Sequence, residues 1–159
     1  MSWLKMVYLS TDRAGTDYKD DYEGIKLIKL NYNYSNKQSF FKRALVFIKF
    51  SLNTCSIVLK EDYDIIYATS TPLTIGIPAL VAKLIRRKKY IFEVRDLWPE
   101  LPRAMGVINN KFIYYFLKIL EISCYKFADV CVGLSPGIIE GITKYVPIKK
   151  TVLISNYSN

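Results

Sequence analysis

In the second half of the chain, short apolar runs alternate with longer helical patterns, and the connections between them are short. The expected elements are strand 63–69, helix 73–86, strand 90–94, helix 111–127, strand 129–134, helix 138–145 and strand 151–154. Strands and helices that alternate in this way form right-handed crossovers between parallel strands. The pattern therefore predicts an α/β fold, with a parallel sheet and helices on its faces.

The first half is expected to contribute two strands and one long helix. Leu4–Ser10 is a short apolar run typical of a buried strand, and the polar, charged stretch Thr11–Gly24 predicts a surface loop or a disordered segment. Gly24–Leu30 roughly alternates apolar residues with lysines, which predicts a strand near a sheet edge with one wetter face. Phe40–Lys60 has no Gly or Pro and predicts a helix, with Ser39 as its cap.

The helix expected at Phe40–Lys60 is rich in apolar residues, and its charges are basic. The apolar residues that recur at helical spacing are Phe40, Phe41, Ala44, Leu45, Ile48, Leu52, Cys55 and Leu59. One interpretation is that this helix lies on an anionic bilayer with its lysines among the headgroups. The other is that it is a core helix whose lysines face water. The basic run Lys83–Lys89 leaves a similar choice between a helix-dipole partner and a membrane or phosphate patch.

Charge and residue usage restrict the classes of function. The chain has 159 residues and a net charge of +9, which favours an anionic partner such as a membrane surface, a nucleic acid or a phosphorylated substrate. It has no histidine, which excludes Ser-His-Asp and Cys-His catalysis and His-ligated metal sites within this chain. Cys55, Cys124 and Cys131 lie far apart in apolar contexts and are expected as free thiols in a reducing compartment. We expect neither a signal peptide nor a membrane-spanning helix.

The stretch Tyr90–Glu100 is an apolar strand that ends in a cluster of charged residues. Glu93, Arg95 and Asp96 lie at its C-terminal end, and Pro99 prevents the strand from continuing. Ligands of open α/β sheets bind outside the carboxyl ends of the strands, so this cluster is a candidate site. The alternative is an ion pair, of Arg95 with Asp96 or Glu93, that only holds a loop in place.

Two neighbouring strands are also expected to end in polar turns. Ser70 and Thr71 follow the strand 63–69, and Ser135-Pro136-Gly137 follows the strand 129–134. Such turns leave backbone N–H groups free to meet a ligand oxygen, although helix capping by Thr71 or Thr74 also explains the first of them. Parallel strands place these turns along one rim, where they can form one site. No glycine-rich dinucleotide motif or P-loop is present.

Several motifs occur in the order and spacing of one enzyme family. They are Asp64–Thr74, Phe92–Glu100, Ala128–Val130, Leu134–Gly137 and Ile154–Asn156. From about Gly24 to Asn156, the chain resembles the N-terminal domain of glycosyltransferase family four, in the branch that includes fucosaminyl transferases of O-antigen and capsule synthesis. The Glu-Val-Arg-Asp-Leu-Trp-Pro-Glu run that ends at Glu100 is quite specific for that branch.

The resemblance implies a GT-B architecture, in which two Rossmann-like domains face each other across a cleft. The N-terminal domain, a three-layer parallel sheet flanked by helices, would bind a lipid-linked saccharide acceptor, and the C-terminal domain would bind the nucleotide-sugar donor. Transfer would retain the anomeric configuration and need no metal and no other cofactor. The protein would be cytoplasmic and peripheral, at the inner face of the bacterial membrane.

The same resemblance assigns roles to the residues at the strand ends. Arg95 and Asp96 would be the catalytic pair. Many family members have a histidine where this chain has Arg95. An arginine suits an acceptor phosphate or hydroxyl, because its guanidinium stays protonated. Asp96 would orient an acceptor hydroxyl. The candidates for substrate binding are Glu93, Glu100, Ser70, Thr71, Ser135 and Gly137.

The chain also departs from the family. Residues 1–159 are expected to be a single N-terminal-like domain without the family's first strand, glycine-rich loop and helix, and without its donor domain. Such a chain would not transfer sugar alone. The alternative is a non-catalytic module that binds a membrane surface or a partner. Nucleic-acid binding is disfavoured, because the sequence has no RNP, KH or helix-turn-helix signature.

Overall fold

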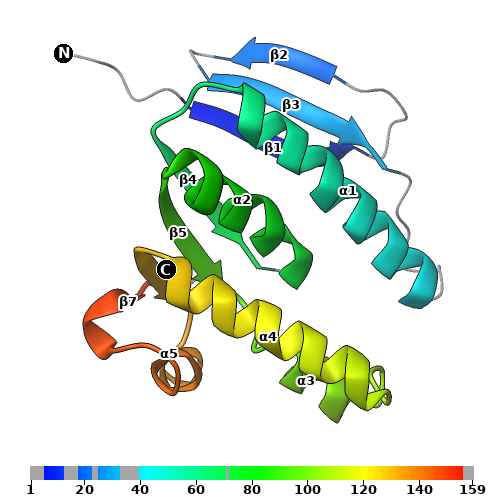
Figure 1. Ribbon diagram of the computed structural model, residues 1–159, viewed down its shortest axis with the longest axis vertical. Coiled ribbons are helices and arrows are strands. Elements are labelled where there is room, and N and C mark those ends of the chain that lie inside the picture. Colours follow the sequence, from blue (N-terminus) through cyan, green and yellow to red (C-terminus); the bar gives the residue numbers. More distant parts are fainter. Residues whose placement is uncertain (1–5, 13–17, 23–24, 33–39, 71, 156–159) are drawn as a thin grey trace. The chain divides into compact units, whose positions relative to one another are not determined.

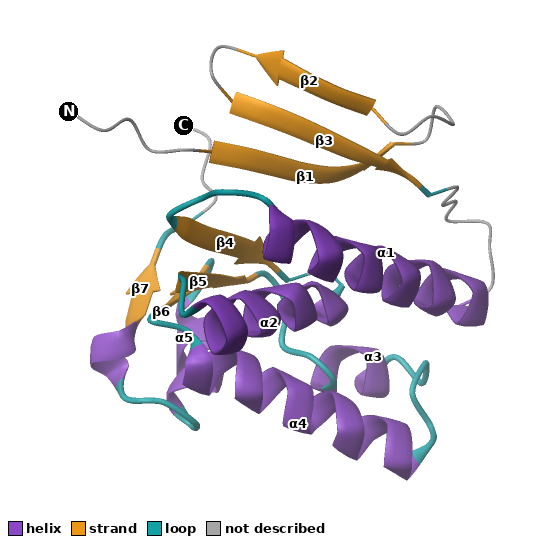
Figure 2. Ribbon diagram, turned by 45° about the horizontal axis from the view of Figure 1, so that its top comes forward, coloured by secondary structure: helices purple, strands orange, loops and turns teal. Residues whose placement is uncertain are grey.

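The computed structural model describes residues 6–12, 18–22, 25–32, 40–70 and 72–155, and Figure 1 and Figure 2 together label its helices and strands. Contacts divide the chain into unit 1, residues 1–64, and unit 2, residues 65–159. Each unit is described by itself below. The expectation of one family domain over the whole chain stays a prediction.

Unit 1 contains a three-stranded mixed sheet. Its strands are β1 (Met6–Asp12), β2 (Tyr18–Tyr22) and β3 (Ile25–Asn31), in the order β1-β3-β2. β3 runs parallel to β1 and antiparallel to β2 (Figure 2). Two sequence predictions are wrong here, because the segment expected as a surface loop contains β2, and β3 lies at the centre of the sheet instead of near its edge.

Both errors have a physical reason. β2 has charged residues at its centre, and an edge strand tolerates charge because only one of its sides is paired. Its place depends on backbone pairing with β3, where Asp21 stands in register with Lys26. The alternation of apolar residues and lysines in β3 is equally typical of a central strand in a sheet with one wet face.

The helix α1 (Phe40–Lys60) has the predicted bounds. From Lys42 onward, its buried residues are Phe50, Ser51, Thr54 and Val58. Four members of the predicted apolar stripe are instead exposed: Leu45, Ile48, Leu52 and Leu59. Thr54 is compatible with burial because its hydroxyl donates to the Phe50 carbonyl at 2.8 Å. Ser39, the expected cap, lies outside the described residues.

Unit 2 contains a four-stranded, all-parallel sheet. Its strands, in the order β4-β5-β6-β7, are β4 (Ile65–Thr69), β5 (Lys89–Val94), β6 (Val130–Gly133) and β7 (Thr151–Leu153). The helices are α2 (Gly76–Arg86), α3 (Glu100–Ala104), α4 (Lys111–Phe127) and α5 (Pro136–Thr143), with short 3₁₀ turns η1 (Leu73–Ile75) and η2 (Ile148–Lys150). The predicted α/β class is confirmed: a parallel sheet flanked by helices, in a Rossmann-like arrangement.

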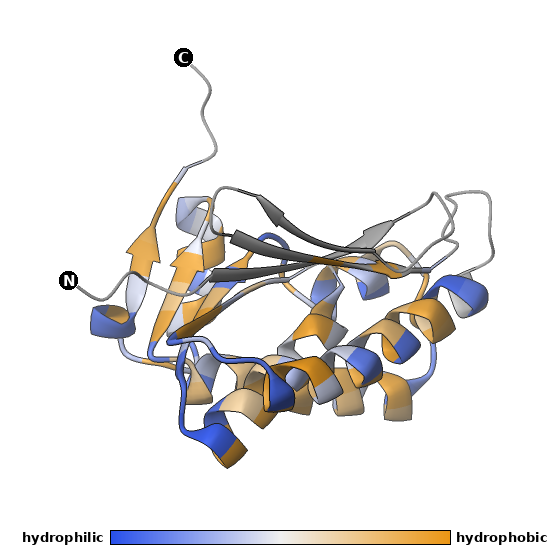
Figure 3. Ribbon diagram, turned by 90° about the horizontal axis from the view of Figure 1, so that it is seen from above, coloured by the Kyte–Doolittle hydropathy of each residue, from blue (hydrophilic) through white to orange (hydrophobic). Residues whose placement is uncertain are grey.

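Alternation along β5 explains the core of unit 2. Tyr90, Phe92 and Val94 are buried on one face of the strand, and burial of an apolar side chain such as Phe92 or Val94 stabilises the fold by about 1.5–3 kcal/mol. The residues that join them in one apolar cluster include Ala79 of α2, Cys124 and Tyr125 of α4, Ile142 of α5, and Val146 just after α5. All three helices therefore cover the same face of the sheet. The strands of unit 2 are mostly hydrophobic in Figure 3.

Of the four helices of unit 2, α4 and α5 begin at side-chain caps, whereas α2 and α3 do not. Asn110 accepts hydrogen bonds from the backbone N–H groups of Phe112 and Ile113, at 2.8 and 3.3 Å. Ser135 caps α5 in the same way. Of the two caps considered for the helix after β4, Thr71 lies outside the described residues, and Thr74 is not the cap, because it lies inside η1, which leads directly into α2.

One ion pair joins α2 to the sheet. Lys83 donates from Nζ to both carboxylate oxygens of Asp129 at 2.7 Å, and one of those oxygens also accepts from the backbone N–H of Tyr90. Burial acts to raise the pKa of Asp129, but these bonds outweigh it, and the pKa is lowered below the ordinary value of 3.8. Lys83 therefore has a local structural partner, Asp129, which neither interpretation of the basic run named. No helix in the described ranges is long and apolar enough to cross a membrane.

Candidate functional site

The carboxyl ends of β4, β5 and β6 lie along one edge of the sheet. Thr69 pairs in register with Glu93, and Val94 pairs with Gly133. The residues that follow these strands, from Ser70, Arg95 and Leu134 onward, therefore leave the sheet at the same edge, as expected for parallel strands. Ligands of open α/β sheets bind at this kind of edge.

Ser70 connects the ends of β4 and β5. Its backbone N–H donates to the Glu93 carbonyl at 2.8 Å, and its Oγ accepts from the backbone N–H of Arg95 at 3.0 Å. Ser70 is almost fully buried. These contacts place Ser70 as a positioning residue that fixes the backbone from which the Arg95 side chain extends.

Arg95 and Asp96 form the bend after β5. Arg95 is exposed, and Asp96 is half-buried. No ion pair between Arg95 and Glu93 occurs within the described part of the chain. The guanidinium is therefore accessible at the rim, where a phosphate or a carboxylate would meet it without having to displace Glu93.

Glu93 has a tyrosine partner that the sequence did not indicate. The Tyr67 hydroxyl donates a hydrogen bond to Glu93 Oε2, and Tyr67 itself is exposed. Burial of the hydroxyl and its bond to Glu93 together raise the pKa of Tyr67 to about 12. Tyr67 and Glu93 stand at alternate positions to the buried Ala68 and Phe92, so they lie on the sheet face opposite the helices.

Glu100 is held by a buried network on α4. Lys118 donates from Nζ to Glu100 Oε1, and to Glu121 Oε2 at 2.6 Å, while the Tyr125 hydroxyl donates to Glu121 Oε1 at 2.7 Å. The Lys118 ammonium also lies 4.6 Å from the centre of the Tyr145 ring. Glu100 thus ties the start of α3 to α4, and a substrate group would have to compete with Lys118 for it.

Burial and bonding perturb the pKa values of this network in opposite ways. Glu121 is 1% exposed, and its burial raises the pKa of the carboxyl above 4.5 although Lys118 and Tyr125 lower it. Burial acts to lower the pKa of Lys118, but its bonds to Glu100 and Glu121 outweigh this and raise it. Lys118 is therefore the cation that both acids, Glu100 and Glu121, contact.

A small pocket adjoins this network. Its volume is about 70 Å³, and its lining residues are Leu97, Glu100, Lys118, Glu121, Gly141, Lys144 and Tyr145. The second carboxylate oxygen of Glu100 is buried and accepts no hydrogen bond from the described residues. This volume holds about two water molecules and is far below that of ordinary ligand pockets. A saccharide would have to bind at the open rim and not in this pocket.

The remaining predicted site residues lie at the third strand end or outside the structure. Ser135 Oγ accepts from the backbone N–H of Ile138 at 3.3 Å, so it caps α5. Gly137 is exposed, and a side chain there would meet no atom within 4 Å, so packing does not require glycine. Thr71 lies outside the described residues. The structure therefore brings Ser70, Glu93 and Arg95 together, and it places Glu100 in a separate cluster.

Sequence reasoning missed three members of these clusters: Tyr67, Lys118 and Glu121. The signal for the last two was the pair of charges three residues apart in an otherwise apolar helix, which suits an ion pair on one helix face. Tyr67 gave no signal beyond its alternation in β4. Within the described ranges, no group of three or more Cys, Asp or Glu residues is arranged to hold a metal ion.

Comparisons with known proteins assign this chain to no family. A scan of the chain against protein-family models gives no match. A search of the curated proteins gives no similar protein either.

Proposed function

We propose that this chain is the acceptor-binding half of a retaining glycosyltransferase, which moves a sugar from a nucleotide-sugar to a lipid-linked saccharide in surface polysaccharide synthesis. The observation that carries the proposal is the rim of unit 2, where Ser70 fixes the backbone of Arg95 beside Glu93. The motif order and the Glu93–Glu100 run support it.

The proposed roles follow from the chemistry of each side chain. The exposed Arg95 guanidinium binds the acceptor's diphosphate, which a permanently charged planar donor suits. Asp96 orients the acceptor hydroxyl, and Glu93 accepts a second sugar hydroxyl beside its bond from Tyr67. The other proposed substrate-binding residues contact the substrate less directly, because Ser70 and Ser135 bind backbone N–H groups and Glu100 binds Lys118. These residues are Ser70, Thr71, Ser135, Gly137 and Glu100.

In this proposal a second domain holds the nucleotide-sugar donor. The chain of unit 1 and unit 2 then binds the acceptor but transfers no sugar by itself, and neither a metal nor another cofactor takes part. Detectable transfer from a nucleotide-sugar by the purified chain would contradict this division of labour.

The second candidate function is a membrane-surface module without catalysis, which α1 supports. Its exposed leucines and isoleucine share the helix with the exposed lysines Lys42, Lys49 and Lys60. A helix with an apolar stripe beside a basic one suits an anionic bilayer surface. Peripheral attachment to the inner face of the bacterial membrane belongs to both candidates, so it does not separate them.

Acceptor binding separates the two candidates. The ligand is a water-soluble saccharide diphosphate with a shortened prenyl chain, and binding is measured by titration calorimetry without vesicles. Arg95→Ala is expected to weaken binding about tenfold or more through the lost charge-assisted bonds. Arg103→Ala, which removes an exposed arginine of α3 outside the rim, is the matched control. Binding that is absent, or equally weakened by both variants, favours the module without catalysis.

A further inference from the structure

The outward face of α4 is aromatic. Phe112 is 87% exposed, and its neighbours on the same face, Tyr115, Phe116 and Ile119, are each more than half exposed. The spacing of these four residues places them along one side of the helix. We call them the α4 stripe. Scattered apolar residues are normal on a protein surface, but a continuous aromatic row marks an interaction site.

The rotation of α4 is fixed from its other side, so the stripe does not belong to the core of unit 2. Glu121, Cys124 and Tyr125 are buried on the inward face, and Lys118 holds Glu121 there. Cys124 packs directly against Gly76 of α2, where a side chain would overlap its sulfur. Turning the stripe inward would break both contacts.

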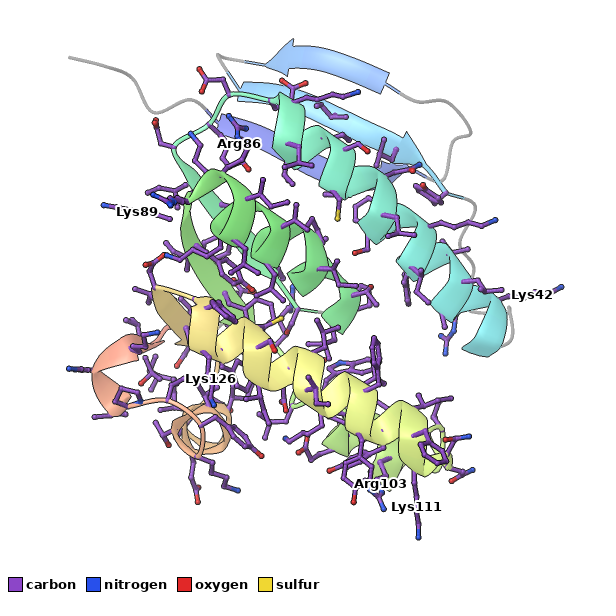
Figure 4. The ribbon with its side chains drawn as sticks, in the orientation of Figure 1. Lys42, Arg86, Lys89, Arg103, Lys111 and Lys126 are labelled. Atoms are coloured by element: carbon purple, nitrogen blue, oxygen red, sulfur yellow. The ribbon has the colours of Figure 1, made fainter. Side chains whose placement is uncertain are left out.

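The exposed charges of residues 101–127, which include α4, are all positive, and the partly exposed Glu100 just before them is paired with Lys118. Between Leu101 and Phe127, the sole acid is Glu121, which is buried. Lys111 precedes Phe112, and Lys126 lies two turns beyond Ile119 on the same side of the helix. Figure 4 shows Arg103 and Lys111 at the N-terminal end of α4 and Lys126 toward its C-terminal end.

These observations select the kind of partner. We infer that the α4 stripe docks on an anionic lipid bilayer, with α4 parallel to the surface, the aromatic rings at the level of the headgroups and acyl boundary, and the lysines among anionic headgroups. A second copy of the chain fits less well, because a two-fold contact through α4 would bring identical cationic patches together. The inference goes beyond the proposed function, since it applies equally to a chain that binds no saccharide.

The α4 stripe also differs from the membrane contact expected from the sequence. That expectation concerned the helix Phe40–Lys60 and the basic run Lys83–Lys89, and not the helix 111–127. The lysine of that run that lies inside α2, Lys83, is paired with Asp129. In the hairpin of α3 and α4, by contrast, no described carboxylate pairs with Lys111 or Lys126.

Vesicle flotation of the full chain tests the inference. With vesicles of phosphatidylglycerol and phosphatidylcholine, the double variant Phe112→Ser/Phe116→Ser is expected to bind about a hundredfold more weakly than the parent chain, about tenfold for each ring. Ile119→Ser is compared with Ile148→Ser, because both isoleucines are 66% exposed and Ile148 lies outside the stripe. The Ile119 variant should bind more weakly and the Ile148 variant should bind as the parent does.

A second measurement reads the contact at the stripe itself. Tryptophan is introduced as Phe116→Trp or, for control, Ile148→Trp, and brominated lipids in the same vesicles quench any indole that enters the bilayer. Quenching is expected to increase over the parent chain for Phe116→Trp and to stay unchanged for Ile148→Trp. Circular dichroism of each variant confirms that the helices persist.

Three results would overturn the inference. One is unchanged vesicle binding in Phe112→Ser/Phe116→Ser, which would leave α1 as the membrane contact. Another is equal quenching of the two introduced tryptophans. The third is a dimer of the parent chain, seen by analytical ultracentrifugation, that the double substitution dissolves while vesicle binding persists, because the stripe would then be an interface between copies.

Discussion

Removing the ammonium of Lys118 should destabilise unit 2 more than any other single charge removal in α4. Lys118→Met keeps the length and apolar stem of the side chain but leaves Glu121, which is 1% exposed, with the Tyr125 hydroxyl as its remaining partner. Removing one partner of a buried ion pair lowers the free energy of unfolding by about 3–5 kcal/mol. Glu100 adds little, since its side chain is 44% exposed and water can screen it. For a chain of this length the loss corresponds to a melting temperature lower by about 6–20 °C.

The loss should depend on pH in a defined direction. The pKa of Glu121 is already raised by burial, and the loss of Lys118 raises it further. An acid whose pKa is higher in the folded chain binds more protons there than in the unfolded chain, so the variant loses stability as the pH rises from about 4.5 through that folded pKa. The destabilisation should therefore be smaller near pH 5 than near pH 7.

Urea unfolding, followed by the fluorescence of Trp98, measures this effect. Trp98 packs against the core of unit 2, and a Trp3→Phe background removes the chain's other tryptophan. Lys126→Met is the control on the same helix, where an exposed lysine should cost less than about 0.5 kcal/mol. Lys118→Met/Glu121→Gln should recover most of the loss, because no uncompensated buried charge remains. A loss below about 1 kcal/mol at pH 7, or the same loss at both pH values, would refute the reasoning.

Three further perturbations test individual contacts of unit 2. Gly76→Ala should destabilise by about 1–3 kcal/mol in urea unfolding, because the new methyl group overlaps the buried sulfur of Cys124; a gain in stability, as helix propensity alone predicts, would show that the contact yields. Ser70→Ala should cost about 1–2 kcal/mol and speed hydrogen exchange at the amide of Arg95, which loses its acceptor, and unchanged exchange would contradict the positioning role. Asp129→Asn should cost less than about 1 kcal/mol near pH 6, because the carboxylate is partly exposed. Since the pKa of Asp129 is lowered in the folded chain, its contribution is present above 3.8 and lost as the pH falls further, so the parent and the variant should converge in acid unfolding.

The sequence was sufficient for the helices and the parallel strands but not for the edges of sheets. Phe40–Lys60 and Lys111–Phe127 were predicted with the observed bounds, because both lack Gly and Pro and Asn110 supplies a cap. β2 was missed, because an edge strand takes its place from backbone pairing, and five residues with three charges carry no apolar period. The order of strands in unit 1 depends on contacts between residues far apart in the sequence, and hydrophobic periodicity does not predict such contacts.

The candidate site was predictable only as far as position along the chain determines position in space. Parallel strands put Ser70, Arg95 and Ser135 at one edge, and the structure has them there. Which atoms meet at that edge follows from side-chain geometry. For this reason Ser70 was expected to face a ligand but binds the backbone of Arg95, and Glu100 was expected at the rim but binds Lys118.

α4 shows most clearly what apolar periodicity leaves open. Its sequence is apolar on almost every side, so the period alone does not say which side is buried. The obvious choice would put Phe112, Phe116 and Ile119 inside and leave Lys118 and Glu121 in water. The chain does the reverse, although each aromatic side chain left exposed loses about 2 kcal/mol of stabilisation that burial would provide. A helix that only filled a core would gain by turning over, and the buried Lys118–Glu121 pair opposes that turn. Exposed rings on a helix held in this orientation are what a surface needs if it is to bind an apolar partner, and the surrounding lysines make an anionic bilayer the partner that fits.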